Sequence, residues 1–432
     1  MSVNPLKRSH PESEIEAFDP KYAKLEIHQD KSAFYPIERE LIKGGYTTVY
    51  HIKGNPKIVC KQEDVSYYPQ ETTMKRVELF AKESSLSREI SGAPHIPLLI
   101  DSFYLEGQST NLILENVGKD IELTHLNPKK KTPLCEIITL GKKWLEALDA
   151  MHKKQIAHLD LKHNNLATNF IFDFGSSQKI PENLMNSQFG DFYFPYRAPE
   201  IGLGKAYGTK ADIWSLACIL FQLYTAEEFS GFDTEDDGDI TDLSATIDAI
   251  HAHAQRFNTA ISSENLLQDS HHDPEYIETL NQQLKIVEVN VRPLRETLLS
   301  VKGLSDSPEM VEKFSDLLEK MFQLNPNDRI SAMDALNHPF FASEISFKLE
   351  VEGEKNVSLC LLDNDYTTIE LIDLAKCKSN TCIHIPAQEK SCILQLYPTN
   401  NPMQTLTSVE IPLTNAGILK INTSIPTICF ES

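Results

Sequence analysis

The stretch His158-Leu159-Asp160-Leu161-Lys162-His163-Asn164-Asn165, followed shortly by Asp173-Phe174-Gly175, decides the fold of this chain. It brings two aspartates, a lysine and an asparagine into one short segment. These residue types can supply a base, a positive charge and the hard oxygen ligands that Mg²⁺ prefers. An isolated Asp or Asn in a loop is more often a turn or cap residue. The two clusters, in this order and close together, are a much more specific signal than either one alone.

Both clusters resemble the signature of protein kinases, in which the catalytic loop reads H-R-D-L-x-x-x-N and the metal loop reads D-F-G. The spacing agrees, because Lys162 follows Asp160 by two residues and Asn165 follows it by five. The resemblance implies that Asp160 is the base that accepts the substrate hydroxyl proton, and that Lys162 neutralises the γ-phosphoryl group during transfer. It also implies that Asn165 and Asp173 bind Mg²⁺ and that ATP is the phosphate donor.

A candidate nucleotide-binding lysine lies upstream. Lys61 ends the strand pattern Val59-Cys60-Lys61, as does the lysine of V-A-I-K that binds the α- and β-phosphates in kinases. A strand lysine by itself is nearly always a solvated surface charge. Lys61 gains weight from Glu83, which lies on the next predicted helix where the family has its lysine-pairing glutamate. Glu89 is the competing choice, and Glu83 fits better because His95-Ile96-Pro97 follows at the expected distance.

Residues 42–50 align with the loop that covers the phosphates in kinases, but this loop is poor in glycine. Only Gly44 falls on a motif glycine, and Thr47 replaces the last one. A glycine-poor loop can still offer backbone N–H groups to phosphate, although it loses close approach and the freedom to adopt positive φ. Taken alone it would be an ordinary hairpin turn. Gly44 and Val49 are its predicted nucleotide-binding residues.

The segment Leu112-Ile113-Leu114-Glu115 matches the strand that leads into the hinge of kinases. By this resemblance, adenine is expected to hydrogen-bond to the backbone near Glu115 and Val117. Leu114 is then the gatekeeper residue, which precedes the hinge in the family.

Segments further along the chain resemble the kinase scaffold, which a chance match to the catalytic loop would lack. Tyr196-Arg197-Ala198-Pro199-Glu200 resembles the end of an activation segment, and Arg329 occupies the place of the arginine that pairs with its glutamate. Asp212-Ile213-Trp214-Ser215 resembles the motif whose aspartate holds the catalytic-loop backbone. Asn337-His338-Pro339-Phe340-Phe341 resembles the segment that closes the domain.

Within the family, the chain most resembles the CMGC group, which contains cyclin-dependent, MAP and SR-protein kinases. The activation-segment motif, the sequence around Asp212 and the long stretch between Tyr224 and Glu309 carry this likeness. Leu159 replaces the usual arginine of the catalytic loop, as in SR-protein, LAMMER-type and homeodomain-interacting kinases, and Thr47 fits the first two. We therefore place the chain near this branch.

The chain also departs from the family pattern. The interval from Asn165 to Asp173 is shorter than usual, which predicts a clipped hairpin, and Tyr193 stands where a threonine usually touches the catalytic residues. Errors of about 1 Å in positioning can cost on the order of 100-fold in rate. A pseudokinase that binds partners with little or no catalysis is therefore the alternative to an active protein serine/threonine kinase. A small-molecule kinase is disfavoured by the scaffold motifs.

Length and composition agree with a two-lobed α+β kinase fold and one small extra domain. The chain has 432 residues, and we expect a flexible leader over 1–33, a kinase domain over 34–341 and a small β-rich domain over 345–432. No apolar run is long enough for a membrane helix, and residues 1–20 do not resemble a signal peptide. Eight cysteines without a C-x-x-C pair indicate a reducing compartment, and we expect a cytoplasmic or nuclear protein.

The net charge of −21 argues against nonspecific nucleic-acid binding and suits a basic protein substrate. An acidic cluster follows the buried helix that is predicted to start near Lys210. In the SR-protein kinases, which the chain resembles, that side of the large lobe carries an acidic docking groove for Arg-rich segments. The corresponding acidic residues here are Asp233, Glu235, Asp236, Asp237, Asp239 and Asp242. The alternative for this cluster is a solvated surface loop. Four histidines nearby lack a metal-ligand pattern and are interpreted as surface residues: His251, His253, His271 and His272.

Overall fold

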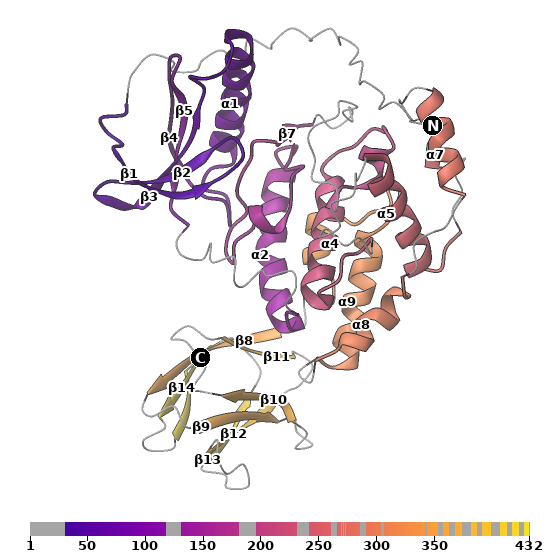
Figure 1. Cartoon of the computed structure of the whole chain (residues 1–432). Helices are drawn as coiled ribbons and strands as arrows, with labels where there is room; N and C mark the ends of the chain where they lie inside the picture. Colours follow the sequence, from indigo (N-terminus) through magenta and orange to yellow (C-terminus); the bar gives the residue numbers. More distant parts are fainter. Residues whose placement is uncertain are drawn as a thin grey trace, which may run out of the picture. The chain divides into compact units, whose positions relative to one another are not determined.

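The computed structural model describes residues 31–117, 131–180, 196–230, 242–260, 266–268, 270, 272, 274–285, 291–303 and 306–341, together with eight strands between residues 344 and 431. The chain divides into two compact units (Figure 1). The first unit consists of Met1–Ser91 and Pro97–Asn116, and the second consists of Gly92–Ile96 and Val117–Ser432.

The first unit is an antiparallel sheet with one long helix, α1 (Gln70–Ile90), beside it (Figure 1). The strand order is β1-β2-β3-β5-β4. The five strands are β1 (Ile37–Lys43), β2 (Thr48–Ile52), β3 (Asn55–Asp64), β4 (Leu99–Leu105) and β5 (Ser109–Glu115). The helix buries Val77, Phe80, Ala81 and Ser84, whose spacing forms one face of an α-helix. The predicted helix that carries Glu83 is thereby confirmed.

The second unit contains the strands beyond residue 343 and a helical part, here called the helical unit, which is built around α4 (Lys210–Thr225). Every residue of α4 from Ala211 to Thr225 is buried. A helix that is apolar on all sides belongs in a core. The other helices are α2 (Leu134–His152), α3 (Pro199–Gly202), α5 (Asp242–Arg256), α7 (Pro274–Gln283), α8 (Leu294–Val301), α9 (Pro308–Met321) and α10 (Ala332–Leu336). Within the described residues, no helix combines the length and the apolar composition that a membrane crossing needs.

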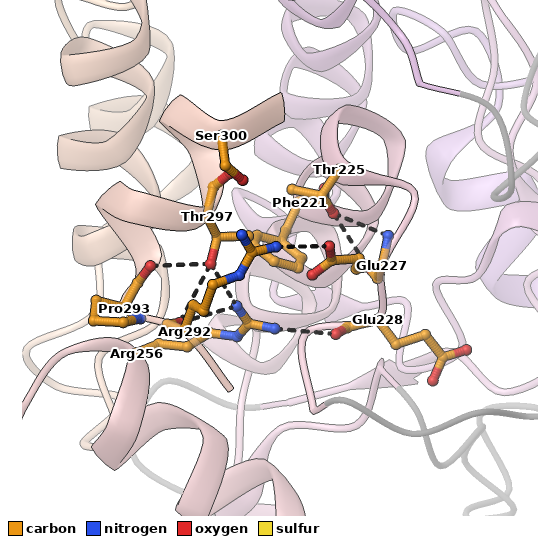
Figure 2. Close-up of polar contacts among 9 residues, drawn as sticks. All are labelled: Phe221, Thr225, Glu227, Glu228, Arg256, Arg292, Pro293, Thr297 and Ser300. Atoms are coloured by element: carbon orange, nitrogen blue, oxygen red, sulfur yellow. Dashed lines mark hydrogen bonds and ion pairs between the residues drawn. The ribbon is translucent and has the colours of Figure 1, made fainter. Parts of the chain in front are cut away.

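A buried arginine ties α4, α5 and α8 together. Figure 2 shows the guanidinium group of Arg256 directed at Glu228 and Thr297, and its Nε–H also donates to the carbonyl of Phe229 at 2.8 Å. The same group lies 4.5 Å from the ring centroid of Phe221. Burial lowers the pKa of Arg256 to about 10, so the guanidinium remains charged at neutral pH. Arg256 thus satisfies backbone carbonyls that would otherwise be buried without donors.

The histidines of α5 correct one expectation from the sequence. His251 and His253 are buried, with 1% and 8% of their surface exposed, so their interpretation as surface residues is wrong. His253 packs its ring against Trp214 and Phe257, and burial lowers the pKa of its imidazole to about 4. Residue type alone did not show this burial, because histidine can face either solvent or, when its ring is neutral and packed, a core. His272 is half-buried, its Nε2 hydrogen-bonds to the carbonyl of Gly202, and His271 lies outside the described residues.

The chain beyond residue 343 forms two four-stranded sheets (Figure 1). Their strand orders are β10-β9-β12-β13 and β11-β8-β14-β15, and β8 and β14 pair in parallel. The strands are β8 (Glu344–Glu352), β9 (Val357–Leu362), β10 (Thr368–Asp373), β11 (Cys382–Pro386), β12 (Ser391–Pro398), β13 (Thr407–Pro412), β14 (Gly417–Asn422) and β15 (Thr427–Glu431). The fold is therefore α+β, with a sheet-rich first unit, a helical second unit and a β-rich C-terminal region.

Candidate active site

The catalytic-loop segment, His158 to Asn165, follows the short strand β6 (Ile156–Ala157) and ends in the 3₁₀ turn His163–Asn165. Its backbone is held by Asp212 of α4, which is 1% exposed. The two carboxylate oxygens of Asp212 accept hydrogen bonds from the N–H groups of His158 and Leu159, each at 2.8 Å. Leu159 has φ of 66°, a conformation that costs a leucine free energy and needs such support. The predicted role of Asp212 as the anchor of this loop is confirmed.

Asp160 is oriented by its two neighbours in the loop. Its Oδ2 atom accepts from Lys162 Nζ at 2.7 Å and from Asn165 Nδ2 at 2.9 Å. Asn165 Nδ2 also donates to the Asp160 carbonyl at 2.7 Å. One carboxylate oxygen is thus taken up by two donors, and Oδ1 is the oxygen that a reacting hydroxyl group could approach. Because the nitrogen of Asn165 makes both bonds, its Oδ1 is the amide atom suited to a cation.

The metal-loop segment is linked to the catalytic loop through His158. The N–H of Asp160 donates to His158 Nδ1 at 3.2 Å, so the proton of this imidazole lies on Nε2, which donates to the Phe172 carbonyl at 3.1 Å. The ring of Phe174 meets His158 edge-on at a centroid distance of 5.6 Å. Asp173 has φ of 65°, which an aspartate tolerates better than most residues. The two oxygen ligands predicted for Mg²⁺ lie on segments joined by the bond from Phe172 N–H to the Asn165 carbonyl, at 3.1 Å.

The hairpin between these segments is reduced to one β-bridge, between Leu166 and Ile171. Ala167 and Phe170 exchange backbone hydrogen bonds around a two-residue turn, which confirms the predicted clipping. His95 stabilises this short hairpin from a distant part of the sequence. Its carbonyl accepts from Ile171 N–H at 2.9 Å, and its Nδ1 bonds to the Asn169 carbonyl at 2.8 Å.

His163 begins a buried hydrogen-bond chain that the sequence did not reveal. Tyr196 donates its hydroxyl proton to Gln222 Oε1 of α4 at 2.5 Å, so the bond between His163 Nδ1 and Tyr196, at 2.8 Å, must run from the imidazole N–H to the Tyr196 oxygen. His163 Nε2 is then a buried acceptor, and none of the residues that the structure describes donates a hydrogen bond to it. Burial lowers the pKa of His163 to about 4, because a second proton would place an uncompensated charge there. This chain fixes the end of the activation segment to the catalytic loop.

In the first unit, Lys61 and Glu83 form an ion pair between β3 and α1. Lys61 Nζ lies 2.7 Å from Glu83 Oε1, and both side chains are 13% exposed. Of the two glutamates considered from the sequence, Glu83 makes this pair. Val49 lies opposite Lys61 in the register of β2 and β3.

The glycine-poor loop closes as a turn in which Gly44 N–H donates to the Thr47 carbonyl at 2.8 Å. A Cβ atom at Gly44 would lie 2.9 Å from that carbonyl oxygen, so glycine is required there. At the end of β5, the N–H groups of Glu115 and Asn116 are used within the sheet, donating to the carbonyls of Leu98 and Lys57. Leu114 lies opposite Val59 in the same sheet.

The scaffold ion pair predicted between Glu200 and Arg329 is confirmed. Arg329 donates from Nη1 and Nη2 to the two Glu200 oxygens, at 2.7 and 2.9 Å, and both side chains are buried. Its remaining N–H groups donate to the carbonyls of Gln323, Lys210 and Leu324. All five donors of the guanidinium group therefore have acceptors.

Three further expectations fall on residues that the structure does not describe. Tyr193 lies in 181–195, and the acidic residues from Asp233 to Asp239 lie in 231–241. The leader lies outside the described residues up to residue 30. Asp242 is the first residue of α5, and only its backbone is described.

Comparison with known proteins gives one family match and several relatives. The family described as protein kinase domain matches residues 35–341. Dual specificity tyrosine-phosphorylation-regulated kinase 3 of Mus musculus is 31% identical over 215 residues, which are 46% of this chain and 35% of that protein. Cyclin-dependent kinase 7 of Dictyostelium discoideum is 28% identical over 322 residues, which are 72% of this chain and 80% of that protein.

Serine/threonine-protein kinase prpf4B of Dictyostelium discoideum is 26% identical over 341 residues, which are 71% of this chain and 39% of that protein. These relatives all belong to the CMGC group. The chain spans only 35% to 39% of the length of the dual specificity kinases that it matches. The matches therefore cover a kinase domain and not the whole of those proteins.

Proposed function

The chain belongs to the protein kinase family, and on that premise we propose that it is a protein serine/threonine kinase that uses ATP and Mg²⁺. The observation that carries the proposal is the arrangement around Asp160, whose Oδ2 is held by Lys162 and Asn165. A base for phosphoryl transfer must present one oxygen in a fixed direction, and this arrangement supports that role for Oδ1. Placement within the SR-protein branch of the CMGC group remains part of the proposal.

In the proposed reaction, Asp160 accepts the proton of the substrate hydroxyl and orients its oxygen for attack. Lys162, 2.7 Å from Asp160, is placed to neutralise negative charge on the transferred phosphoryl group. Asn165 and Asp173 would hold Mg²⁺, and their oxygen donors fit this hard cation. When bound, the metal ion neutralises charge on the β- and γ-phosphates.

For the nucleotide, we propose that Lys61, fixed by Glu83, binds the α- and β-phosphates, with Gly44 and Val49 in the covering loop. The N–H groups of Glu115 and Asn116 at the end of β5 already donate within the sheet, which limits the backbone groups that adenine could bind. Since Glu115 N–H donates to Leu98, adenine would use the Glu115 carbonyl and the backbone of Val117. Leu114 would be the gatekeeper.

Activity is proposed to be independent of phosphorylation in the activation segment. In many kinases, a phosphate there pairs with the arginine that precedes the catalytic aspartate. Here that position is Leu159, which is 6% exposed and cannot pair with an anion. Phosphate-free protein should therefore be as active as phosphorylated protein, and a large activation by an upstream kinase would contradict this.

We further propose a basic, Arg/Ser-rich protein substrate, which the net charge of −21 supports. The domain organisation proposed is a kinase domain over 34–341 and a β-rich domain over 345–432 that binds another protein. The alternative function is a pseudokinase, and Thr47 in place of a loop glycine is the observation that favours it.

The test is transfer of labelled γ-phosphate from ATP to an Arg/Ser-rich peptide and to an acidic peptide. Asp160→Asn should lower kcat by about 10² to 10⁴, the usual contribution of a general base. Asp149→Asn, which removes an aspartate from a surface ion pair with Lys153 on α2, is the matched control and should remain active. Asp173→Ala should abolish stabilisation by Mg·ATP in a thermal-shift assay.

Two outcomes would overturn the proposal in different ways. Wild-type protein that binds Mg·ATP but transfers no phosphate to any hydroxyl peptide would be a pseudokinase. Wild-type protein that shows no Mg²⁺-dependent stabilisation at millimolar ATP would not use this nucleotide at all.

A further inference from the structure

A second ion pair joins β3 to α1 beside the pair of Lys61 and Glu83. Glu63 is 5% exposed and accepts two hydrogen bonds from Arg76, from Nε at 2.6 Å and from Nη2 at 3.0 Å. The pair is bidentate, so it fixes both the distance and the orientation of the two groups. None of the sequence motifs pointed to it.

The two ion pairs lie on matching faces of their elements. Glu63 follows Lys61 by two residues, and alternate residues of a strand project from the same face. Arg76 precedes Glu83 by seven residues, which places them two turns apart on the same side of the helix. The charges run in opposite directions, with the cation on β3 in one pair and on α1 in the other. A rotation or a slide of α1 would separate both pairs at once.

Arg76 also contacts the tip of the phosphate-covering loop. Its guanidinium carbon lies 4.6 Å from the centroid of the Tyr46 ring, within the range of a cation–π interaction. Tyr46 is 65% exposed, so burial does not explain where its ring lies. The aromatic ring at the tip of the loop is thus attached to the helix that carries Glu83.

This attachment addresses the shortage of glycine in the loop. The turn from Gly44 to Thr47 sets the local shape of the loop, but a single turn does not fix its tip relative to α1. Arg76 is held on one side by the buried carboxylate of Glu63 and offers its flat face to Tyr46 on the other. Loop, strand and helix therefore meet at one side chain.

We propose that Glu63, Arg76 and Tyr46 form a positioning brace that holds Lys61, Glu83 and the covering loop in the geometry that binds the phosphates of ATP. None of the three acts on the reacting atoms. The brace places α1 by contacts within its own unit, so the pair of Lys61 and Glu83 forms without a partner protein. This inference rests on the proposed nucleotide-binding role of Lys61.

The central variant is Arg76→Met, which keeps the apolar stem and removes both contacts. We expect the Kd for Mg·ATP to rise about tenfold, because the variant loses both the bidentate pair with Glu63 and the contact with the Tyr46 ring. The KM for the peptide substrate should stay near its wild-type value. Arg76→Lys should restore only part of the affinity, because an ammonium group cannot bind Glu63 bidentately. Lys75→Met, which removes an exposed cation from the next residue of α1, is the matched control and should bind Mg·ATP normally.

Hydrogen exchange over residues 42–50, measured without nucleotide, gives an independent result. Arg76→Met and Tyr46→Leu should both increase exchange in this loop, while Tyr46→Phe, which keeps the aromatic face, should not. If Arg76→Met does not fold, the two Tyr46 variants alone decide the outcome, because Tyr46 is exposed and its replacement leaves the core intact.

Normal Mg·ATP affinity and wild-type loop exchange in Arg76→Met would overturn the proposal. If wild-type protein binds no Mg·ATP, the proposed function fails, and loop exchange then decides the brace by itself. Increased exchange in that case would support the brace as a structural link, and unchanged exchange would reject it.

Discussion

Two neutral histidines in the helical unit should make its stability fall as the pH falls from 7 to 5. The pKa of His163 and that of His253 are each lowered by burial from 6.5 to about 4. In the unfolded chain both imidazoles bind a proton below about pH 6.5, whereas in the folded protein they remain neutral until about pH 4. The unfolded state then binds more protons, so acid favours unfolding in this window.

The magnitude follows from the two pKa values. At pH 5, each unfolded histidine lies about 1.5 units below its pKa, which corresponds to about 2 kcal/mol of lost stability per residue. Both together should cost about 4 kcal/mol, a large share of the roughly 5 to 15 kcal/mol that stabilises an ordinary domain. Asp101 and Asp316 have lowered pKa values, so their contribution is lost only below 3.8 and leaves this window unaffected. His338, whose pKa is also lowered by burial, acts in the same direction.

The assay is urea unfolding at pH 7 and pH 5, followed by tryptophan fluorescence. Both tryptophans of the chain, Trp144 and Trp214, are buried in the helical unit, so the signal reports on that unit. The quantity to compare is the difference in unfolding free energy between the two pH values within each variant, because any general loss of stability cancels. His163→Asn and His253→Phe should each reduce this difference by about 2 kcal/mol.

The matched control is His51→Asn on β2, which removes a histidine from the other unit and should leave the difference unchanged. A double variant, His163→Asn with His253→Phe, should lose most of the acid sensitivity between pH 7 and pH 5. If the double variant loses as much stability as the wild type on acidification, the two imidazoles are not the groups that titrate, and the reasoning from their burial is wrong.

Three further substitutions test contacts that hold the catalytic loop and the helical unit in place. Asp212→Asn should lower the unfolding free energy by about 1 to 3 kcal/mol and reduce kcat, because one backbone N–H that holds the catalytic loop loses its acceptor. An unchanged unfolding free energy in urea and an unchanged kcat for peptide phosphorylation would contradict this. Gly202→Ala should lower the unfolding free energy by about 1 to 3 kcal/mol or more, since its Cβ would lie 1.8 Å from Thr246 Oγ1. Adding Thr246→Gly to the same chain should recover part of this loss on urea unfolding. Arg256→Met should cost about 3 kcal/mol or more, because it leaves the carbonyls of Glu228 (Figure 2) and Phe229 without donors, and Arg256→Lys should recover only part. A loss below about 1 kcal/mol on urea unfolding would show that these carbonyls find other donors.

The sequence predicted best those features whose partners are set by motifs at fixed spacing. The pairs of Lys61 with Glu83 and of Glu200 with Arg329 could be named before any coordinates, because each motif specifies a position in a known fold. The clipped hairpin followed from counting residues, since the interval from Asn165 to Asp173 leaves room for little more than one bridge.

The features that the sequence missed depend on tertiary packing. His251 and His253 lie in a helix whose buried face also includes Ile247 and Ile250, and only the packing of that helix shows that both imidazole rings are buried as well. Arg256 looks like a surface cation until its carbonyl acceptors are seen. The pair of Glu63 and Arg76 did have a signal, because both residues share a face with the motif residues Lys61 and Glu83. Such spacing shows that Glu63 and Arg76 lie on the same faces of β3 and α1 as Lys61 and Glu83, but it does not show that they pair with each other.

The two halves of the proposed active site have one property in common, which is that each is held by contacts within its own unit. In the helical unit, Asp212 fixes the backbone at Leu159, where many other kinases carry an arginine that pairs with a phosphate. In the sheet unit, Arg76 fixes α1 and the covering loop through Glu63 and Tyr46. A kinase whose catalytic loop and helix are both held in this way has little to gain from an activating phosphate or an activating subunit. We therefore expect its output to be set by access to substrate, which directs attention to charge on the substrate and to the C-terminal strands.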